Sequence, residues 1–170
     1  MQMGTGIATQ VQILTEHGWE NVHDDIFTRY DEKTHHPFSE QNYGVFAFLA
    51  DVRNYACVPV LSEPRGLPAV EKAAAQIESL WEFNGTTEWP DHENNTSATW
   101  YLVSELLEFD YDVEFENRRN DANRDNPHPP GRGKRMTIRE YLKPKFFEDL
   151  LILKRLGDPD KTRVVISFAS

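Results

Sequence analysis

The stretches Ile7-Ala-Thr-Gln-Val-Gln-Ile-Leu14 and Arg163-Val-Val-Ile-Ser-Phe168 lie near the two ends of the chain and decide the fold. In the first stretch, Ile7, Val11 and Ile13 alternate with small or polar residues, which is typical of a strand with one buried face. The second stretch is an almost continuous apolar run, which favours a central strand of a sheet. We therefore expect the two terminal strands to pair.

Between these ends, apolar residues recur mainly at the spacing of amphipathic helices. The predicted helices cover residues 42–52, 69–83, 97–109, 137–142 and 144–156. Further strands are expected at 19–22 and 110–116, whereas 23–41 and 53–68 are interpreted as loops because they are polar or rich in proline. This order predicts an α+β fold, with a small mixed or antiparallel sheet whose terminal strands pair and which is packed by three to four helices.

Length and composition are those of one domain over residues 1–170. The segment 117–135 is rich in Asn, Arg, Pro and Gly and has almost no apolar side chains. We interpret it as an exposed insertion or loop, whose arginines could close over an anion. The only cysteine, Cys57, lacks an internal disulfide partner, which favours a reducing compartment.

Charge and hydropathy argue against two classes of binding partner, nucleic acids and membranes. The chain carries 28 acidic and 18 basic side chains, a net charge of −10, which argues against direct nucleic-acid binding. Neither a signal sequence nor an apolar run of about 18 residues is present, so we expect a cytoplasmic protein without membrane contact. The sequence leaves open whether the chain forms a homo-oligomer.

The sequence offers little that is typical of catalysis. All histidines fall in predicted loops, and an HExxH spacing is absent, so we expect neither a metal nor a cofactor. Cys57 has no basic neighbour in its own segment, and a GxSxG turn is absent. The pattern leans away from an enzyme and assigns no catalytic residue.

Two loop segments favour the binding of an anion. Arg53 and Asn54 stand at the end of a predicted helix, and Arg65 and Gly66 lie in the proline-stiffened segment Glu63-Pro64-Arg65-Gly66-Leu67-Pro68. Arginine forks match phosphate and carboxylate groups, and glycine lets a ligand approach the backbone closely. A surface pair of Arg53 with an acidic neighbour explains the same residues equally well.

Two aromatic residues could add a stacking surface for such a ligand. These candidates are Tyr43 and Trp100, for which packing in the core is the competing interpretation. For Trp100 we favour core packing.

The segment 63–68, together with Gly157-Asp158-Pro159 and Arg163-Val164-Val165, resembles an uncharacterised family of small proteins from bacteriophages and bacteria. Its members open with Met-Gly-Cys-Asp-Ile-His, contain Pro-Arg-Gly-Leu-Pro and end with Phe-Asp-Asn. This chain instead has Thr5-Gly6-Ile7-Ala8, Gln12 at a later acidic position, and Phe168-Ala169-Ser170. The resemblance implies a divergent member that lacks an Asp/His/Glu cluster of the family.

The resemblance and the arginines together favour a phage-type protein that sequesters a nucleotide-like anionic ligand without catalysis, as a counter-defence device in the host cytosol. A metal-dependent hydrolase acting on such a ligand is the first alternative. Its ligands would be His23, Asp24, His35, His36, Asp91 and His92. An acidic inhibitor of a host protein is the second alternative, in which Asp110, Asp112, Glu114 and Glu116 would face a basic surface.

Overall fold

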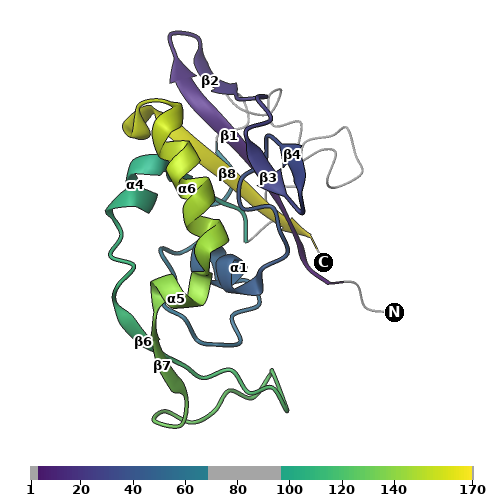
Figure 1. Ribbon diagram of the computed structural model, residues 1–170, viewed down its shortest axis with the longest axis vertical. Helices are drawn as coiled ribbons and strands as arrows, with labels where there is room; N and C mark the ends of the chain where they lie inside the picture. Colours follow the sequence, from purple (N-terminus) through teal and green to yellow (C-terminus); the bar gives the residue numbers. More distant parts are fainter. Residues whose placement is uncertain (1–3, 69–96, 170) are drawn as a thin grey trace.

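The fold is built on the pairing of the two terminal strands. A computed structural model describes residues 4–68 and 97–169 (Figure 1). Strands β1 (Gly6–Thr15) and β8 (Thr162–Ala169) are antiparallel, and their register runs from Gly6 opposite Ala169 to Ile13 opposite Thr162. With β2 (Gly18–Asn21) and β5 (Thr99–Leu102) they form a sheet of order β2-β1-β8-β5. The predicted α+β class and the pairing of the terminal strands are confirmed.

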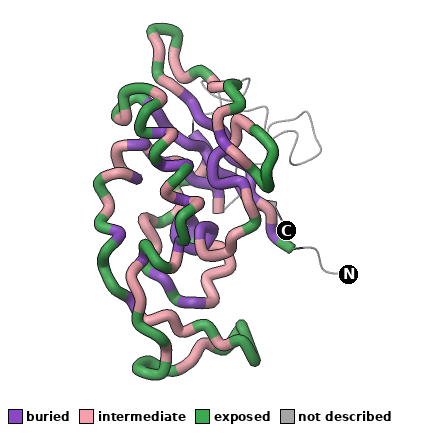
Figure 2. The backbone as a smooth tube through the Cα atoms, viewed as in Figure 1, coloured by how far each residue is buried: buried purple, intermediate pink, exposed green. Residues whose placement is uncertain are grey.

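The α-helices of the described residues gather beside the β1–β8 pair (Figure 1). They are α1 (Tyr43–Ala50), α4 (Val103–Glu108), α5 (Ile138–Leu142) and α6 (Pro144–Leu156), and a 3-10 helix (Pro159–Lys161) precedes β8. Figure 2 shows buried positions concentrated in β1, β8 and α1. The three consecutive residues Val164, Val165 and Ile166 are completely buried, as expected of a central strand covered on both faces. The predicted helix at 69–83 lies outside the described residues.

The helix boundaries follow from local chemistry. Asn42 caps α1, because its Oδ1 accepts hydrogen bonds from the amides of Gly44 at 2.9 Å and Val45 at 3.3 Å. The helix ends at Asp51, whose φ of 59° is left-handed. Lys143, with φ of 72°, separates α5 from α6, and Pro144 begins the second helix as predicted.

Two small hairpins complete the described structure. One joins β3 (Phe27–Arg29) to β4 (Glu32–Thr34), and the other joins β6 (Glu114–Asn117) to β7 (Lys134–Thr137). The interpretation of 23–41 as a loop was therefore wrong in part. The turn residues Tyr30 and Asp31 have φ of 47° and 70°, a conformation usually signalled by Asn-Gly, so the usual turn signal is missing from this segment.

The predicted helix at 97–109 was wrong in its first half. Thr99 and Tyr101 are completely buried, whereas Trp100 and Leu102 are half-buried, which is the alternation of a strand. This segment pairs with the edge of β8 that β1 does not occupy, and it therefore forms strand β5 before α4 begins. The strand predicted at 110–116 is likewise shorter and begins only at Glu114.

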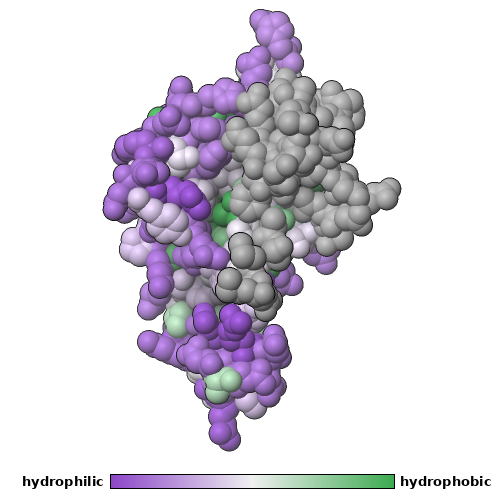
Figure 3. Space-filling model, turned by 90° about the vertical axis from the view of Figure 1, so that its right-hand side faces the viewer, coloured by the Kyte–Doolittle hydropathy of each residue, from purple (hydrophilic) through white to green (hydrophobic). Residues whose placement is uncertain are grey.

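Residues 117–135, here called the arm, form the tip of the β6–β7 hairpin with its flanks. The six residues 121–126 are all exposed. Figure 3 shows that the end of the molecule where the arm lies is almost entirely hydrophilic.

Among the described residues, helices of the length and apolar character needed to span a membrane are absent.

Candidate functional site

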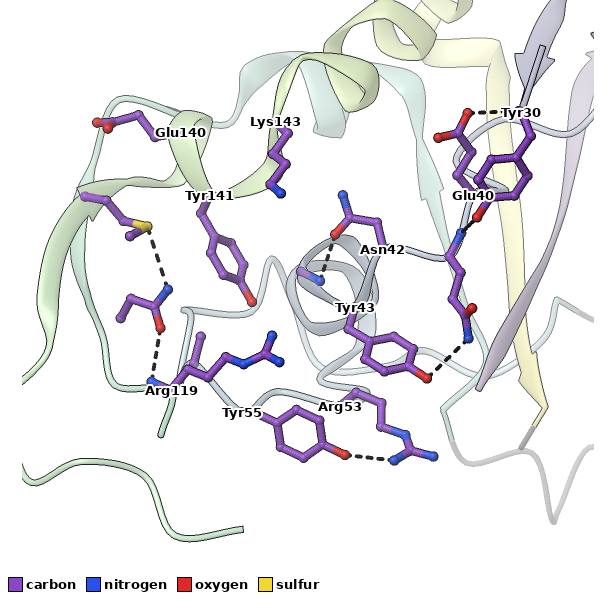
Figure 4. A pocket seen from close by; sticks show the side chains of 15 residues that line it. Tyr30, Glu40, Asn42, Tyr43, Arg53, Tyr55, Arg119, Glu140, Tyr141 and Lys143 are labelled. Atoms are coloured by element: carbon purple, nitrogen blue, oxygen red, sulfur yellow. Dashed lines mark hydrogen bonds between the residues drawn. The ribbon is translucent and has the colours of Figure 1, made fainter. Parts of the chain in front are cut away.

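A cavity of about 710 Å³ opens beside the start of α1 (Figure 4). This volume falls within the range of about 300–1,000 Å³ that is typical of small-molecule sites. Its walls come from the β3–β4 turn, the start of α1 with the residues before it, the loop after α1, the β6–β7 hairpin with the arm, and the α5–α6 junction. The lining carries four tyrosines, three cations and two glutamates. These residues are Tyr30, Tyr43, Tyr55, Tyr141, Arg53, Arg119, Lys143, Glu40 and Glu140.

Arg53 is fixed at the edge of this cavity. Its Nε donates to the Thr5 hydroxyl and its Nη1 to the Tyr55 hydroxyl, each at 2.8 Å. The guanidinium carbon lies 5.6 Å from the ring centre of Tyr43. The hydrogen bond to Tyr55 raises the pKa of Arg53, so its charge is permanent. Its Nη2 has no hydrogen-bond partner among the described residues.

Lys143 supplies a second cation without an internal partner. Its side chain extends into the cavity from the α5–α6 junction (Figure 4). Within residues 4–68 and 97–169, its ammonium group makes neither an ion pair nor a hydrogen bond. An exposed ammonium group that is not neutralised by a carboxylate is a natural contact for an anion.

Tyr141 supplies a hydroxyl in the same space. Its ring packs edge-on against Phe115, with centroids 5.2 Å apart, and burial raises the pKa of Tyr141 to about 12. The hydroxyl is therefore protonated at neutral pH, points toward Arg119 in Figure 4, and has no hydrogen-bond partner in the described part of the chain. A Cβ at position 44 would lie 3.2 Å from the Tyr141 ring, so Gly44 allows this close approach.

Arg119 brings the arm into the cavity wall. Its Nε lies 3.0 Å from Oδ1 of Asp121, in a pair that is exposed and therefore weak. The arm is attached near this point by a 3.0 Å hydrogen bond from the Arg118 amide to the Ala56 carbonyl. Arg124 also lies over the ring of Tyr55, 5.0 Å from its centre.

Both glutamates in the lining are held by backbone amides. Oε1 of Glu140 accepts from the Thr137 amide at 3.3 Å and the Thr137 hydroxyl at 3.1 Å, which caps α5. Oε2 of Glu40 accepts from the Tyr30 amide at 3.2 Å. The lining therefore combines three cations with two engaged carboxylates, whereas the whole chain has a net charge of −10.

The six residues predicted to bind a ligand fall into separate places. Arg53 and Tyr43 line the cavity, and Arg53 forms an ion pair with neither Asp51 nor Glu63. Asn54 instead braces its own loop, because its side chain bonds Asp51 and both backbone groups of Val58 at 2.8–3.0 Å. Arg65, Gly66 and Trp100 do not line the cavity.

Arg65 forms an ion pair with a carboxylate. Its Nη1 and Nη2 donate to the two oxygens of Glu105 at 2.8 and 2.5 Å, and Nη1 also donates to the Trp100 carbonyl at 3.1 Å. This two-pronged pair raises the pKa of Arg65 and lowers the pKa of Glu105. Gly66, with φ of 78°, donates its amide to the Ala98 carbonyl at 2.8 Å. These contacts anchor the 63–68 segment against β5.

Sequence reasoning missed Tyr55, Tyr141 and Lys143, and it treated Arg119 only as one of several arginines in the insertion. These residues meet through tertiary contacts, which local spacing does not encode. One local signal was available for Lys143, because a residue before proline is driven out of the helical conformation and its side chain is redirected. The tyrosines stand at half-buried positions that resemble ordinary core positions.

The alternative clusters are only partly assembled. The rings of His35 and His36 are 3.9 Å apart, and the ring of His23 is 5.7 Å from that of His35. Within the described residues, however, no group of three or more His, Cys, Asp or Glu side chains could hold a metal ion, and Asp91 and His92 lie outside them.

Three of the four acidic residues considered for an inhibitor have internal partners, and Asp110 is one of them because it accepts from the Asp112 amide at 3.0 Å. Asp112 binds Arg139 at 2.9 Å, and Glu116 accepts from the Gly131 amide at 2.8 Å. Asp110 and Glu114 are exposed, with Glu114 on β6.

The positions at which this chain departs from the resembling family lie on the terminal strands. Gly6 stands opposite Ala169, and Ala8 packs in a small buried cluster with Ala98 and Val165. Gln12 accepts a hydrogen bond from Arg163 at 2.9 Å. Comparisons with protein-family models, curated proteins and solved structures gave no match.

Proposed function

We propose that the protein binds a nucleotide-like anionic ligand in the cavity beside α1 and retains it without chemical conversion. One observation carries the proposal. Arg53, Lys143 and Tyr141 line one cavity large enough for a nucleotide, and each keeps a hydrogen-bond donor that no described residue engages. Charged donors of this kind recognise phosphate or carboxylate oxygens.

The tyrosines support a ligand that also has a flat ring. Four tyrosines line the cavity, and aromatic side chains stack on nucleobases with little loss of conformational entropy. A purely inorganic anion would not need so wide a site. The combination of rings and cations therefore favours a nucleotide over phosphate alone.

The composition of the lining supports binding without turnover. Histidine, cysteine, serine and aspartate are absent from the described residues that line the cavity. Both glutamates accept backbone hydrogen bonds, and burial raises the pKa of Tyr141 still further above neutral pH, so its hydroxyl does not act as a base. These residues can hold an anion, but they do not form a pair of general acid and general base. Because the sequence resembles a phage family, we propose a host signalling nucleotide as the natural ligand.

The test is incubation of the purified protein with a panel of cyclic and linear nucleotides, followed by thermal denaturation and chromatography of the ligand. A ligand at 100 times its Kd stabilises the folded state by about 2.7 kcal/mol, which corresponds to a rise of several degrees in Tm at this chain length. We expect such a rise for at least one nucleotide, and the same nucleotide should be recovered intact after heating. Conversion of the nucleotide would instead indicate an enzyme, and an unchanged Tm across the panel would contradict the proposal.

A further inference from the structure

The cavity has a second end whose hydrogen-bonding character is opposite to that of the cationic end. Gln41 uses both hydrogens of its amide nitrogen, donating to the Thr5 carbonyl at 3.0 Å and to the Tyr43 hydroxyl at 3.2 Å. Its amide oxygen is left as an acceptor. Glu40 accepts from the Tyr30 amide through Oε2 only, so its Oε1 is also left as an acceptor. Gln41 and Glu40 therefore offer acceptors, whereas Lys143 and Tyr141 offer donors at the cationic end of the cavity. Arg53 lies beside Gln41, because both side chains donate to Thr5.

The segment that carries these acceptors is rigidly held. The Tyr30 hydroxyl accepts from the Gln41 amide at 2.7 Å, while the Tyr30 amide donates to Glu40. Two residues earlier, the Phe38 amide donates to the buried carboxylate of Asp149 at 2.8 Å. The backbone on both sides of Glu40 is thus held by hydrogen bonds, and one oxygen of its carboxylate is held by the Tyr30 amide. In Figure 4, Glu40 and Tyr30 lie across the cavity from Arg119 and Tyr141.

We infer that the site selects a guanine-type nucleotide, with the phosphate at the cationic end and the base edge at Glu40. This inference rests on the proposed binding of a nucleotide. Guanine presents a ring N–H beside an exocyclic amino group, and these parallel donors match the two oxygens of a carboxylate as a guanidinium fork does. Hypoxanthine keeps the ring N–H and lacks the amino group. Uracil places carbonyl oxygens beside its ring N–H, and these would face the Glu40 carboxylate unfavourably.

The test is equilibrium dialysis of the wild-type protein with GMP, IMP and UMP. A site that uses a hydrogen bond to a ligand strongly rejects the analogue that lacks it, because a buried polar group is left without a partner. We expect GMP to bind at least tenfold more tightly than IMP, and UMP to bind more weakly than IMP.

The decisive variant is Glu40→Gln, with Glu148→Gln as its control, because Glu148 is an exposed residue of α6 outside the cavity. Glu40→Gln should bring the affinities for GMP and IMP to within about twofold of each other, whereas Glu148→Gln should keep the wild-type ratio. Thermal denaturation checks that both variants fold.

Two results would overturn the inference, and they have different meanings. Equal binding of GMP, IMP and UMP by the wild-type protein, or a GMP preference that survives Glu40→Gln, would refute base selection and leave the proposed nucleotide binding intact. Failure of all three nucleotides to bind would refute base selection, and an unchanged Tm across the whole panel of cyclic and linear nucleotides would refute nucleotide binding as well.

Discussion

Arg53 and Arg65 stand in similar sequence surroundings and have different roles in the structure. Each follows a helix or a proline in an irregular segment, and each lies against an aromatic ring, Tyr43 for Arg53 and Trp100 for Arg65. Arg65 gives both terminal nitrogens to Glu105. Within the described residues, Arg53 bonds only uncharged hydroxyls, and its Nη2 has no partner there.

The difference teaches how to separate a binding arginine from a structural one. Arginine is always charged, so what decides its role is whether a carboxylate already occupies its fork. Glu105 is 40 residues beyond Arg65, so the pair depends on the fold and cannot be read from either segment alone. We expect substitutions around Arg53 to change ligand affinity and those around Arg65 to change stability.

The largest effect on affinity is expected for Lys143→Ala. Because Lys143 lacks an internal partner among the described residues, its removal should leave Tm almost unchanged and weaken nucleotide binding roughly tenfold to a hundredfold, the equivalent of about 1.4–2.8 kcal/mol. Dialysis against the nucleotide that gives the greatest rise in Tm measures this change. Lys154→Ala is the control, since Lys154 is exposed on α6 and is not among the residues that line the cavity. Equal losses of affinity in the two variants would contradict the assignment of Lys143 as a ligand contact.

A matched pair of tyrosines sharpens the comparison. The Tyr101 hydroxyl, in the Arg65 region, donates to the buried Leu49 carbonyl at 2.5 Å, whereas the Tyr141 hydroxyl has no partner within residues 4–68 and 97–169. Tyr101→Phe should therefore lower stability by about 1–2 kcal/mol and leave affinity unchanged. Tyr141→Phe should lower affinity about tenfold at nearly constant Tm. The comparison fails if the two variants exchange these effects.

Arg65→Ala directly tests the prediction that Arg65 stabilises the fold and does not bind the ligand. The side chains of Arg65 and Glu105 are 29% and 32% exposed, so solvent screens their attraction, and we expect a loss of only about 0.5–1 kcal/mol in unfolding free energy. Urea denaturation measures this loss, and nucleotide affinity should remain within twofold of the wild-type value. A large loss of affinity would place Arg65 in the ligand site.

The smallest effect is expected for the pH dependence of the stability that the Arg65–Glu105 pair contributes. Hydrogen bonding to Arg65 lowers the pKa of Glu105 below its ordinary value of 4.5. The ionised carboxylate therefore stabilises the fold above about pH 4.5, and this contribution is lost as the pH falls through the lowered pKa. Glu105→Gln should differ from the wild-type protein in Tm above pH 5 and converge with it at lower pH. A difference in Tm that is constant between pH 7 and pH 3 would contradict this origin.

Much of the fold was predictable because burial leaves a periodic trace in the sequence. The alternation in residues 7–14 and the apolar run in 163–168 predicted the paired strands correctly. The segment 99–109 could not be resolved, because its apolar residues satisfy both the helical and the strand spacing over the first turn. The available edge of β8 decides that Thr99–Leu102 is a strand, and this is a tertiary effect.

The site was predictable only in part. Arg53 and Tyr43 were identified from chemistry and position, and both line the cavity. Arg65 has the same chemistry and is occupied by a carboxylate far along the chain. Lys143 enters the cavity because the helix is interrupted before Pro144, and Tyr141 enters it because its ring packs closely over Gly44. Convergence of this kind is fixed by the packed core and not by any short motif.

The most direct test of the account is equilibrium dialysis of one nucleotide against the wild-type protein, Arg53→Gln and Arg65→Gln at equal protein concentration. The nucleotide is the one that raises Tm most, and thermal denaturation confirms that each variant is folded. The account predicts saturable binding to the wild-type protein, at least a tenfold loss in Arg53→Gln, and less than a twofold change in Arg65→Gln. Equal losses in the two variants, or the absence of saturable binding to the wild-type protein, would contradict it.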